Sequence, residues 1–136
     1  MNGEYTVICI GSNTATKHNT VAGILSELQS MLTDFHCSDI YENDDDTGLG
    51  APYVNAVCSG IFDGSYETLA EFASAREKEF GRTPQSKPSG IMPLDIDIII
   101  FDGNLICRRQ SQKPYFLFGL KQIPVRHHTC LLTPKS

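Results

Sequence analysis

Tryptophan, long hydrophobic runs and C-x-x-C pairs are all absent from this chain of 136 residues. Because no apolar run reaches about 18 residues, a transmembrane helix is not expected. The five cysteines are scattered and odd in number, so neither a zinc ribbon nor a dithiol redox motif is predicted. The N-terminal residues lack the basic and then apolar layout of a signal peptide. Together these absences lead us to expect a protein of the reducing cytoplasm.

Positive charge is in deficit, and the common nucleotide-binding loops are missing. A net charge of −5 argues against general nucleic-acid binding, which requires a basic face. Gly48-Leu49-Gly50 lacks the third glycine of a dinucleotide fingerprint, and no G-x-x-x-x-G-K-[ST] loop occurs. Near the C-terminus, His127-His128-x-Cys130 has no further ligand beside it and predicts a loosely held tail, not a metal site.

Size and periodicity predict one α+β domain over residues 1–136, since the mass of 15.0 kDa suffices for a single core. The spacing of hydrophobic and turn residues predicts helices at about 18–32 and 65–80, and strands at 5–10, 35–41, 53–62, 94–101 and 104–107. The order β-α-β-β-α-β is that of a ferredoxin-like plait, an antiparallel sheet with both helices on one face. Asp102-Gly103 predicts a hairpin that adds a further strand. The helix-free face is expected to be left for ligands, and residues 115–123 predict one short helix packed on the sheet.

The most informative stretch is the strand at 94–101, with the sequence LDIDIIIF. Side chains alternate across a strand, so Asp95 and Asp97 are expected on one side and Ile96, Ile98 and Ile100 on the other. Two buried neighbouring carboxylates raise each other's pKa and need a cation to neutralise them. Mg²⁺ is usually held by one or two carboxylates plus substrate phosphates. The pattern therefore predicts a metal–phosphate site at the mouth of the sheet.

The alternative is that both aspartates face solvent on a half-exposed sheet. The run from Ile98 to Phe101 is apolar on both faces, which argues for a strand covered on both sides at that end. Its acidic end would then open into a cleft.

Four segments in the order of the predicted elements point to one family. They are Ile10-Gly11-Ser12-Asn13, Pro52-Tyr53-Val54-Asn55-Ala56-Val57, Glu77-x-x-x-Gly81-Arg82, and Leu94-Asp95-Ile96-Asp97-Ile98 with Phe101. Over about residues 5–106 the chain resembles the 6-hydroxymethyl-7,8-dihydropterin pyrophosphokinase family of folate biosynthesis. The resemblance implies transfer of pyrophosphate from ATP to the hydroxymethyl group of the pterin, with release of AMP.

The resemblance also implies roles for particular residues. Asp95 and Asp97 would hold two Mg²⁺ ions that bridge the ATP phosphates and the attacking hydroxyl, with Arg82 as a further catalytic residue. The pterin would be bound by Gly11, Tyr53, Asn55 and Tyr115. The nucleotide would be bound by Glu77, Lys87, Ile98, Arg108 and Lys113.

Each of these residues also has a purely structural interpretation. Asn55 could bond only to backbone, the two tyrosines could be core residues, Glu77 and Arg82 could form a surface ion pair, and the segment 11–13 could be a simple turn.

The chain departs from the family in the loop 82–93, which lacks the family's arginines and tryptophan and keeps only Lys87 after Arg82. It is also shorter after the hairpin, where Arg108, Arg109 and Lys113 are the candidates to replace lost contacts. The acidic segment 42–46 is read as a solvated loop. A second hypothesis is therefore a pterin- or nucleotide-binding module without efficient catalysis, and a third is an interaction domain that assembles through its sheet edge.

Overall fold

A computed structural model describes residues 3–45, 48 and 50–124, so the predictions for the C-terminal tail and for His127, His128 and Cys130 lie outside the described residues. The strands are β1 (Glu4–Ser12), β2 (Leu32–Cys37), β3 (Tyr41–Asn43), β4 (Tyr53–Phe62), β5 (Asp95–Phe101) and β6 (Asn104–Leu105). The helices are α1 (Lys17–Met31), α2 (Tyr66–Glu79), α3 (Ser86–Ser89), α4 (Arg108–Ser111) and α5 (Pro114–Leu120).

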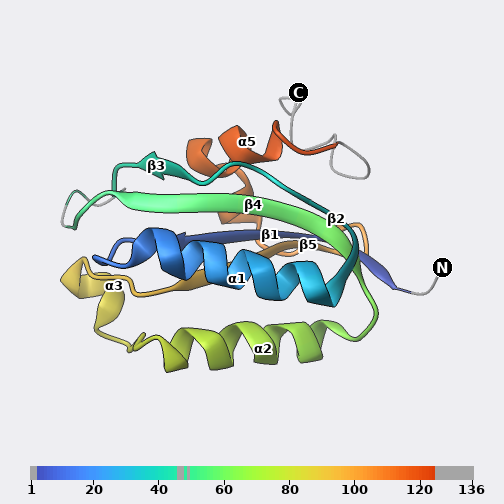
Figure 1. Ribbon diagram of the computed structural model, residues 1–136, viewed down its shortest axis with the longest axis horizontal. Helices are drawn as coiled ribbons and strands as arrows, with labels where there is room; N and C mark the ends of the chain where they lie inside the picture. The colour runs from blue at the N-terminus through green and yellow to red at the C-terminus, as the bar shows by residue number, and fades with distance from the viewer. Residues whose placement is uncertain (1–2, 46–47, 49, 125–136) are drawn as a thin grey trace.

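The strands form one open antiparallel sheet of six strands, and the fold is α+β. The order along the sheet is β2-β4-β1-β5-β6, and β3 also pairs with β4. The long strand β1 lies between β4 and β5, so residues from three strands meet at the end of the sheet where β1 finishes (Figure 1).

Local signals set most element boundaries as predicted. Helix α2 begins after Ser65, whose hydroxyl accepts a hydrogen bond from the Thr68 amide at 3.1 Å. The helix ends at Glu79, and Gly81, just beyond the C-cap residue Phe80, adopts φ +99°, a conformation that favours glycine. The Asp102-Gly103 turn has positive φ at both residues, 54° and 73°, and joins β5 to β6 as expected.

The predicted strand at 35–41 is wrong in its extent, because two strands occupy this region. Strand β2 begins directly after α1, and it ends at Cys37. Ser38 then interrupts the ladder: its backbone amide donates to the Val57 carbonyl, and its hydroxyl accepts from the Val57 amide. Pairing with β4 resumes in β3. The short helices α3 and α4 were not predicted either.

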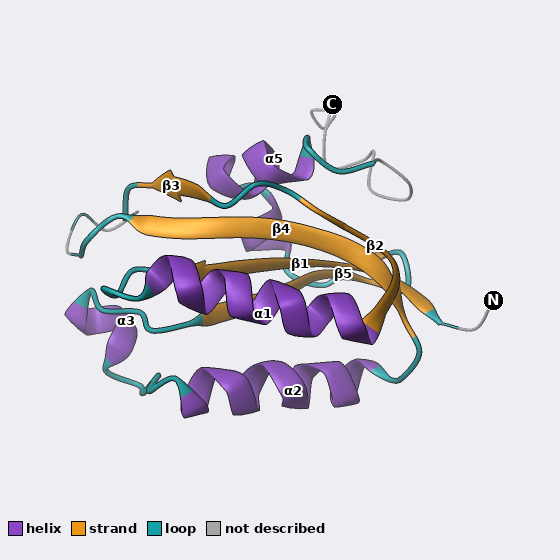
Figure 2. Ribbon diagram, viewed as in Figure 1, coloured by secondary structure: helices purple, strands orange, loops and turns teal. Residues whose placement is uncertain are grey.

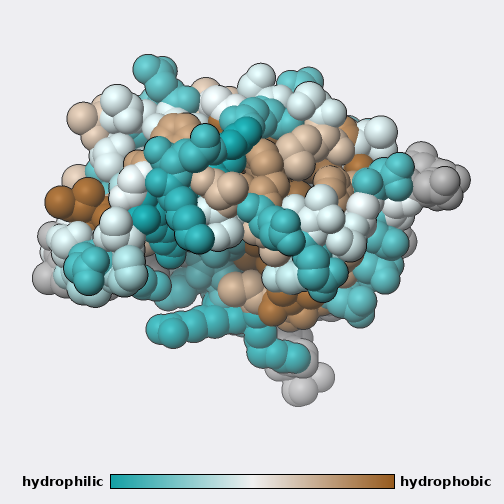
Figure 3. Space-filling view, turned by 90° about the horizontal axis from the view of Figure 1, so that it is seen from below, coloured by the Kyte–Doolittle hydropathy of each residue, from teal (hydrophilic) through white to brown (hydrophobic). Residues whose placement is uncertain are grey.

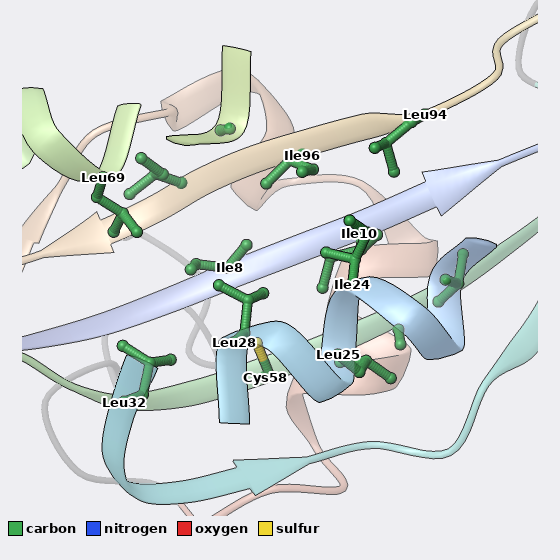
Figure 4. Packing of buried hydrophobic residues seen from close by; sticks show 14 of the residues in the cluster. Ile8, Ile10, Ile24, Leu25, Leu28, Leu32, Cys58, Leu69, Leu94 and Ile96 are labelled. Atoms are coloured by element: carbon green, nitrogen blue, oxygen red, sulfur yellow. The ribbon is translucent and has the colours of Figure 1, made fainter. Parts of the chain in front are cut away.

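Helices α1 and α2 cover one face of the sheet (Figure 2). The core on this face joins side chains of both helices to β1, β4 and β5, and includes Ile8, Ile24, Leu28, Leu69 and Ile96 (Figure 4). On the side of α2 the surface is mostly hydrophilic, with hydrophobic patches between the polar side chains (Figure 3).

The two long helices share one face as predicted, but the opposite face is not free of helices, which corrects the expectation that this face is left for ligands. Helix α5 lies on this side of the sheet (Figure 1), as expected for residues 115–123, and buries Phe116 and Leu120 against Val7, Val57 and Ile99. The short helix was expected on the sheet, but the sequence did not indicate on which face it would lie. Ligands are therefore confined to the part of this face that α5 leaves open.

A register shift in β5 corrects a second expectation. Ile100 was expected with Ile96 and Ile98, but it packs on the α5 side together with Ile99. The pairing of β1 with β5 shifts between Val7 and Ile8, so one extra residue of β5 is accommodated there and the alternation restarts. The two faces at this end of β5 are both buried, as the apolar run indicated. Among the described residues no helix is long and apolar enough to cross a membrane.

Candidate active site

Strand alternation places the predicted site residues of the sheet on the face that α5 partly covers. Gly11 of β1 pairs with Asn55 of β4 on one side and with Asp95 of β5 on the other. Cys9 pairs with Asp97 and belongs to the core beneath α5. Because side chains two residues apart share a face, Asp95 and Asp97 point to the same side as Asn55.

These residues line a cavity of about 190 Å³ at the end of the sheet. Nine of the predicted site residues contribute to its wall: Gly11, Tyr53, Asn55, Arg82, Lys87, Asp95, Asp97, Lys113 and Tyr115. The remaining wall comes from Cys9, Asn43, Asp44, Asp45, Gly90, Met92, Arg109 and Gln110. Segments far apart in sequence therefore converge where β1, β4 and β5 meet the loop 82–93 and the segment α4–α5.

Arg82 joins two carboxylates at the edge of this cavity. Its Nη1 lies 2.8 Å from Asp95 Oδ1 and 2.8 Å from Glu77 Oε2. Glu77 Oε2 also accepts a hydrogen bond from the Ile96 amide at 2.8 Å. The turn at Gly81 explains the geometry, because it brings the Arg82 amide back to the Glu77 carbonyl, 3.0 Å away. Burial raises the pKa of Glu77, and the ion pair with Arg82 opposes that shift.

Asp97 is the most strongly perturbed acid of the site. Burial, followed by the charge of Asp95, raises the pKa of Asp97 to about 8, and Arg82 lowers it only in part. Its Oδ2 accepts a hydrogen bond from Gln110 Nε2 at 3.2 Å. The raised pKa means that the surroundings of Asp97 do not fully compensate its ionised form, so a cation bound beside it would be stabilising.

The donor set suits Mg²⁺ in company with a phosphate ligand. Among the described residues, no three His, Cys, Asp or Glu side chains group to hold a metal by themselves. A pair of carboxylates beside a cavity is the arrangement in which Mg²⁺ draws its other ligands from water and substrate phosphates. Asp95 forms an ion pair with Arg82, but Asp95 and Asp97 both still line the cavity.

On the opposite wall, Asn55 is buried and held in place by its neighbours. Its Nδ2 donates to Asn43 Oδ1 on the adjacent strand β3. A side chain at position 11 would clash with it, because a Cβ there would lie 2.6 Å from Asn55 Oδ1. Glycine at position 11 thus makes room for the Asn55 amide.

Tyr115 stands at the first turn of α5, after Pro114. Its hydroxyl accepts a hydrogen bond from Gln110 Nε2, and its carbonyl accepts one from the Tyr41 hydroxyl. Helix α5 lies close to the sheet at Gly119, where a Cβ would come within 2.5 Å of the Tyr41 hydroxyl and of Val57. Both ends of α5 are therefore fixed relative to β3 and β4.

Three predicted nucleotide-site residues lie outside the cavity. Glu77 and Ile98 border a second depression of about 350 Å³ between α2 and β5, which Asp97 also lines. Ile98 is only 8% exposed and packs in the core beneath the helices. Arg108 is exposed on α4, while its neighbour Arg109 lines the main cavity.

Sequence reasoning missed the role of Asn13. This buried side chain donates from Nδ2 to the carbonyls of Gly90 (2.8 Å) and Ala51 (3.2 Å) and accepts at Oδ1 from the Met92 amide (2.6 Å). It thereby ties the end of β1 to both loops that wall the cavity. Glycine at position 50 allows this, since a Cβ there would lie 2.0 Å from the Gly90 carbonyl oxygen. The G-S-N triplet was the only signal, and it also fits a plain turn.

Two acids of the 42–46 segment also border the cavity, although this segment was expected to be a solvated loop. Asp44 is exposed at the rim. Asp45 is partly buried, and its Oδ2 accepts a hydrogen bond from the Gly50 amide at 2.9 Å. The composition of the segment gave no indication that the loop folds back so that Asp45 contacts Gly50.

A scan against protein-family models matches residues 7–129 to the family 7,8-dihydro-6-hydroxymethylpterin-pyrophosphokinase (HPPK). The match spans most of the chain, so the chain belongs to this family. No curated protein matches the chain.

Proposed function

We propose that this member of the pyrophosphokinase family transfers the terminal pyrophosphate of ATP to 6-hydroxymethyl-7,8-dihydropterin and releases AMP. One observation carries the proposal: two neighbouring strand carboxylates, Asp95 and Asp97, share a cavity with Asn55 and Tyr115. Acids for a metal–polyphosphate complex and groups able to recognise a flat heterocycle thus lie in one site. The strand order supports the finer expectation of a ferredoxin-like plait extended by β6.

The reaction asks the protein for positioning and for neutralisation of charge. The hydroxymethyl oxygen of the pterin forms a bond to the β-phosphorus of ATP, the bond from that phosphorus to the α,β-bridging oxygen breaks, and the hydroxyl proton is released. Asp95 and Asp97 would hold two Mg²⁺ ions, which supply charge stabilisation and alignment of the phosphates when bound. Arg82 lines the same cavity, and we expect it to exchange its contact with Asp95 for one to a phosphate oxygen.

On the pterin side, residues of the chain bind the heterocycle and orient it. Asn55 offers an amide whose conformation Asn43 and Gly11 fix, so its hydrogen-bonding groups are preorganised. Tyr53 and Tyr115 supply aromatic walls, and the ring of Tyr115 replaces the phenylalanine that the family resemblance implies. Lys87, Arg109 and Lys113 add positive charge around the cavity for the triphosphate.

The depression between α2 and β5 is the proposed place for the rest of the nucleotide. Its wall combines the apolar Ile98 with Glu77 and Asp97, and Asp97 also lines the main cavity. A base resting there would have its phosphates pointing toward the paired acids.

The test is formation of AMP from Mg-ATP and 6-hydroxymethyl-7,8-dihydropterin, followed by chromatography. The expected result is AMP in equal amount to pterin pyrophosphate, dependent on both substrates and on Mg²⁺. AMP formation no faster than in the Asp95→Asn control would contradict the proposal.

A binding module without efficient catalysis is the second candidate, and the contacts of Arg82 favour it. This arginine is engaged by both Glu77 and Asp95, and Lys87 is the other cation that the loop 82–93 contributes to the cavity. Fewer cations available for the triphosphate weaken nucleotide binding. Calorimetry separates the two, because a module of this kind would bind pterin without measurable binding of Mg-ATP.

A further inference from the structure

Gln110 lies between the two halves of the site and contacts both. Its Nε2 donates to Asp97 Oδ2 at 3.2 Å and also to the Tyr115 hydroxyl. All three side chains line the same cavity. Neither strand periodicity nor the four family-like segments singled out this residue, because it belongs to the shorter segment after the hairpin.

The local fold gives Gln110 a defined position. The short helix α4 follows β6, and only residues 112 and 113 separate α4 from α5. The Ser111 hydroxyl bonds the Arg108 carbonyl at 2.6 Å and is itself buried, which fixes this turn against the sheet. The Lys113 amide donates to the Gln110 carbonyl at 3.1 Å, so the backbone of Gln110 is joined directly to the start of α5.

A neutral amide can orient a metal-binding carboxylate without placing a positive charge beside it. A neutral N–H orients Asp97 without cancelling its charge, so the acid remains able to attract a cation. Partners of this kind, one shell behind the metal ligand, commonly change metal affinity by about 10- to 100-fold when they are removed. Arg82 differs because it brings a full positive charge to Asp95.

We propose that Gln110 is a positioning residue that couples the divalent-cation side of the cavity to its aromatic side, an inference that rests on the proposed function for the nature of the two ligands. The same Nε2 serves Asp97 and the Tyr115 hydroxyl. A heterocycle that shifts the Tyr115 ring alters the hydrogen bond on Asp97, and a cation that shifts Asp97 alters the hydrogen bond on Tyr115. By linkage, each ligand must change the affinity of the other by the same factor.

The experiment measures Mn²⁺ binding by the paramagnetic resonance of the free ion, with and without saturating 6-hydroxymethylpterin, in full-length chains. The parent is expected to show a change of about fivefold or more in Mn²⁺ affinity when the pterin is present. Gln110→Ala is expected to weaken Mn²⁺ binding by about tenfold and to bring the effect of the pterin close to none.

Two further variants separate coupling from general damage. Tyr115→Phe keeps the ring and the Asp97–Gln110 bond, so it should lose the coupling but retain the Mn²⁺ affinity of the parent measured without pterin. Gln112→Ala is the matched control, because Gln112 is exposed, follows the same helix and does not line the cavity. It should behave as the parent.

The outcomes distinguish this inference from the proposed function. A Gln110→Ala chain with parental Mn²⁺ affinity and parental coupling overturns the role of Gln110, even if the parent forms AMP. A parent that binds Mn²⁺ but no pterin contradicts the pterin half of the proposed function and the coupling, while the Mn²⁺ affinity of Gln110→Ala still decides whether Gln110 positions Asp97. A parent that binds no Mn²⁺ in the absence of nucleotide overturns the coupling, whereas the AMP assay still decides the proposed function.

Discussion

The two halves of β5 differ in what covers them, and this difference locates the chemistry of the protein. From Ile98 to Phe101 the strand is buried on both faces, by the core under α1 and α2 and by the core under α5. At Asp95 and Asp97 the α5 side is open, and side chains of Arg82 and Gln110 take the place of packed hydrophobic residues. One strand therefore stabilises the sheet at one end and presents charge to a cavity at the other.

The comparison also shows how the free-energy cost of the acidic half of β5, which contains Asp95 and Asp97, is offset by its apolar half, residues 98–101. Burying two carboxylates together costs free energy, which is visible in the raised pKa of Asp97. The apolar half supplies compensating burial, of the order of 25 cal/mol per Å² of apolar surface removed from water. The experiments below separate the two halves by changing one while leaving the other intact.

The largest effect is expected at the acidic half. Asp95→Asn and Asp97→Asn each preserve shape and remove a charge, so AMP formation should fall by about 1,000-fold or more while the fold persists. Turnover is measured by AMP chromatography, and circular dichroism checks the fold. A matched Asp63→Asn variant, at an exposed position, should keep parental turnover. Parental rates in both site variants would remove the acids from the mechanism.

At the apolar half, Ile99→Ala should reduce stability. Ile99 is fully buried in the core under α5, so truncation to alanine should lower the free energy of unfolding by about 3 kcal/mol, measured by urea denaturation. Ile91→Ala is the control, since that side chain is 59% exposed and should change stability by less than about 0.5 kcal/mol. Nucleotide affinity of folded Ile99→Ala should match the parent; a selective loss of ligand binding would show that the two halves are not separable.

Asn13→Ala is expected to loosen the loops that frame the acidic half. Removing this amide leaves the buried Met92 amide and Gly90 carbonyl without their partner, at a cost of about 2 kcal/mol. Hydrogen exchange should accelerate at Met92 more than in β4. Asn104→Ala, on the exposed hairpin, serves as the control. Unchanged exchange at Met92 would mean that other contacts hold the loop.

A final prediction concerns the pH dependence of stability. Because the pKa of Asp97 rises from an ordinary 3.8 to about 8 on folding, the native state binds the extra proton between these values and loses stability as pH increases through them. Asn does not titrate, so Asp97→Asn without metal should melt close to the parent near pH 4 and above the parent near pH 8. A difference that is constant across this range would contradict the perturbed state of Asp97.

The sequence predicted the parts of this molecule that follow from periodicity and turn chemistry. Strand β4 has the bounds that were expected, and α1, α2 and the Asp102-Gly103 hairpin agree closely. The common face of Asp95 and Asp97 followed from alternation alone. The bulge that reverses Ile100 could not be predicted, because it depends on how β5 pairs with β1.

Site residues were predicted where the residue type itself restricts the possible chemistry. They were missed where the role of a residue depends only on its tertiary contacts. Burying paired acids in an apolar strand costs free energy, so the sequence alone identified Asp95 and Asp97 as candidate site residues. Asn13 and Gln110 are ordinary polar residues in a turn and a short helix, and only the contacts to Met92 and Asp97 reveal what they do. The roles of the predicted ligand-binding residues remain predictions until ligands are bound.

The central claim is that Asp95 and Asp97 bind divalent cations together with a polyphosphate. It is tested most directly by anomalous diffraction from crystals grown with Mn²⁺ and a non-hydrolysable ATP analogue. We predict anomalous peaks within coordination distance of both carboxylates, with Arg82 moved from Asp95 toward a phosphate oxygen. Bound nucleotide with no peak at either acid, and with the Arg82–Asp95 ion pair intact, would contradict the claim.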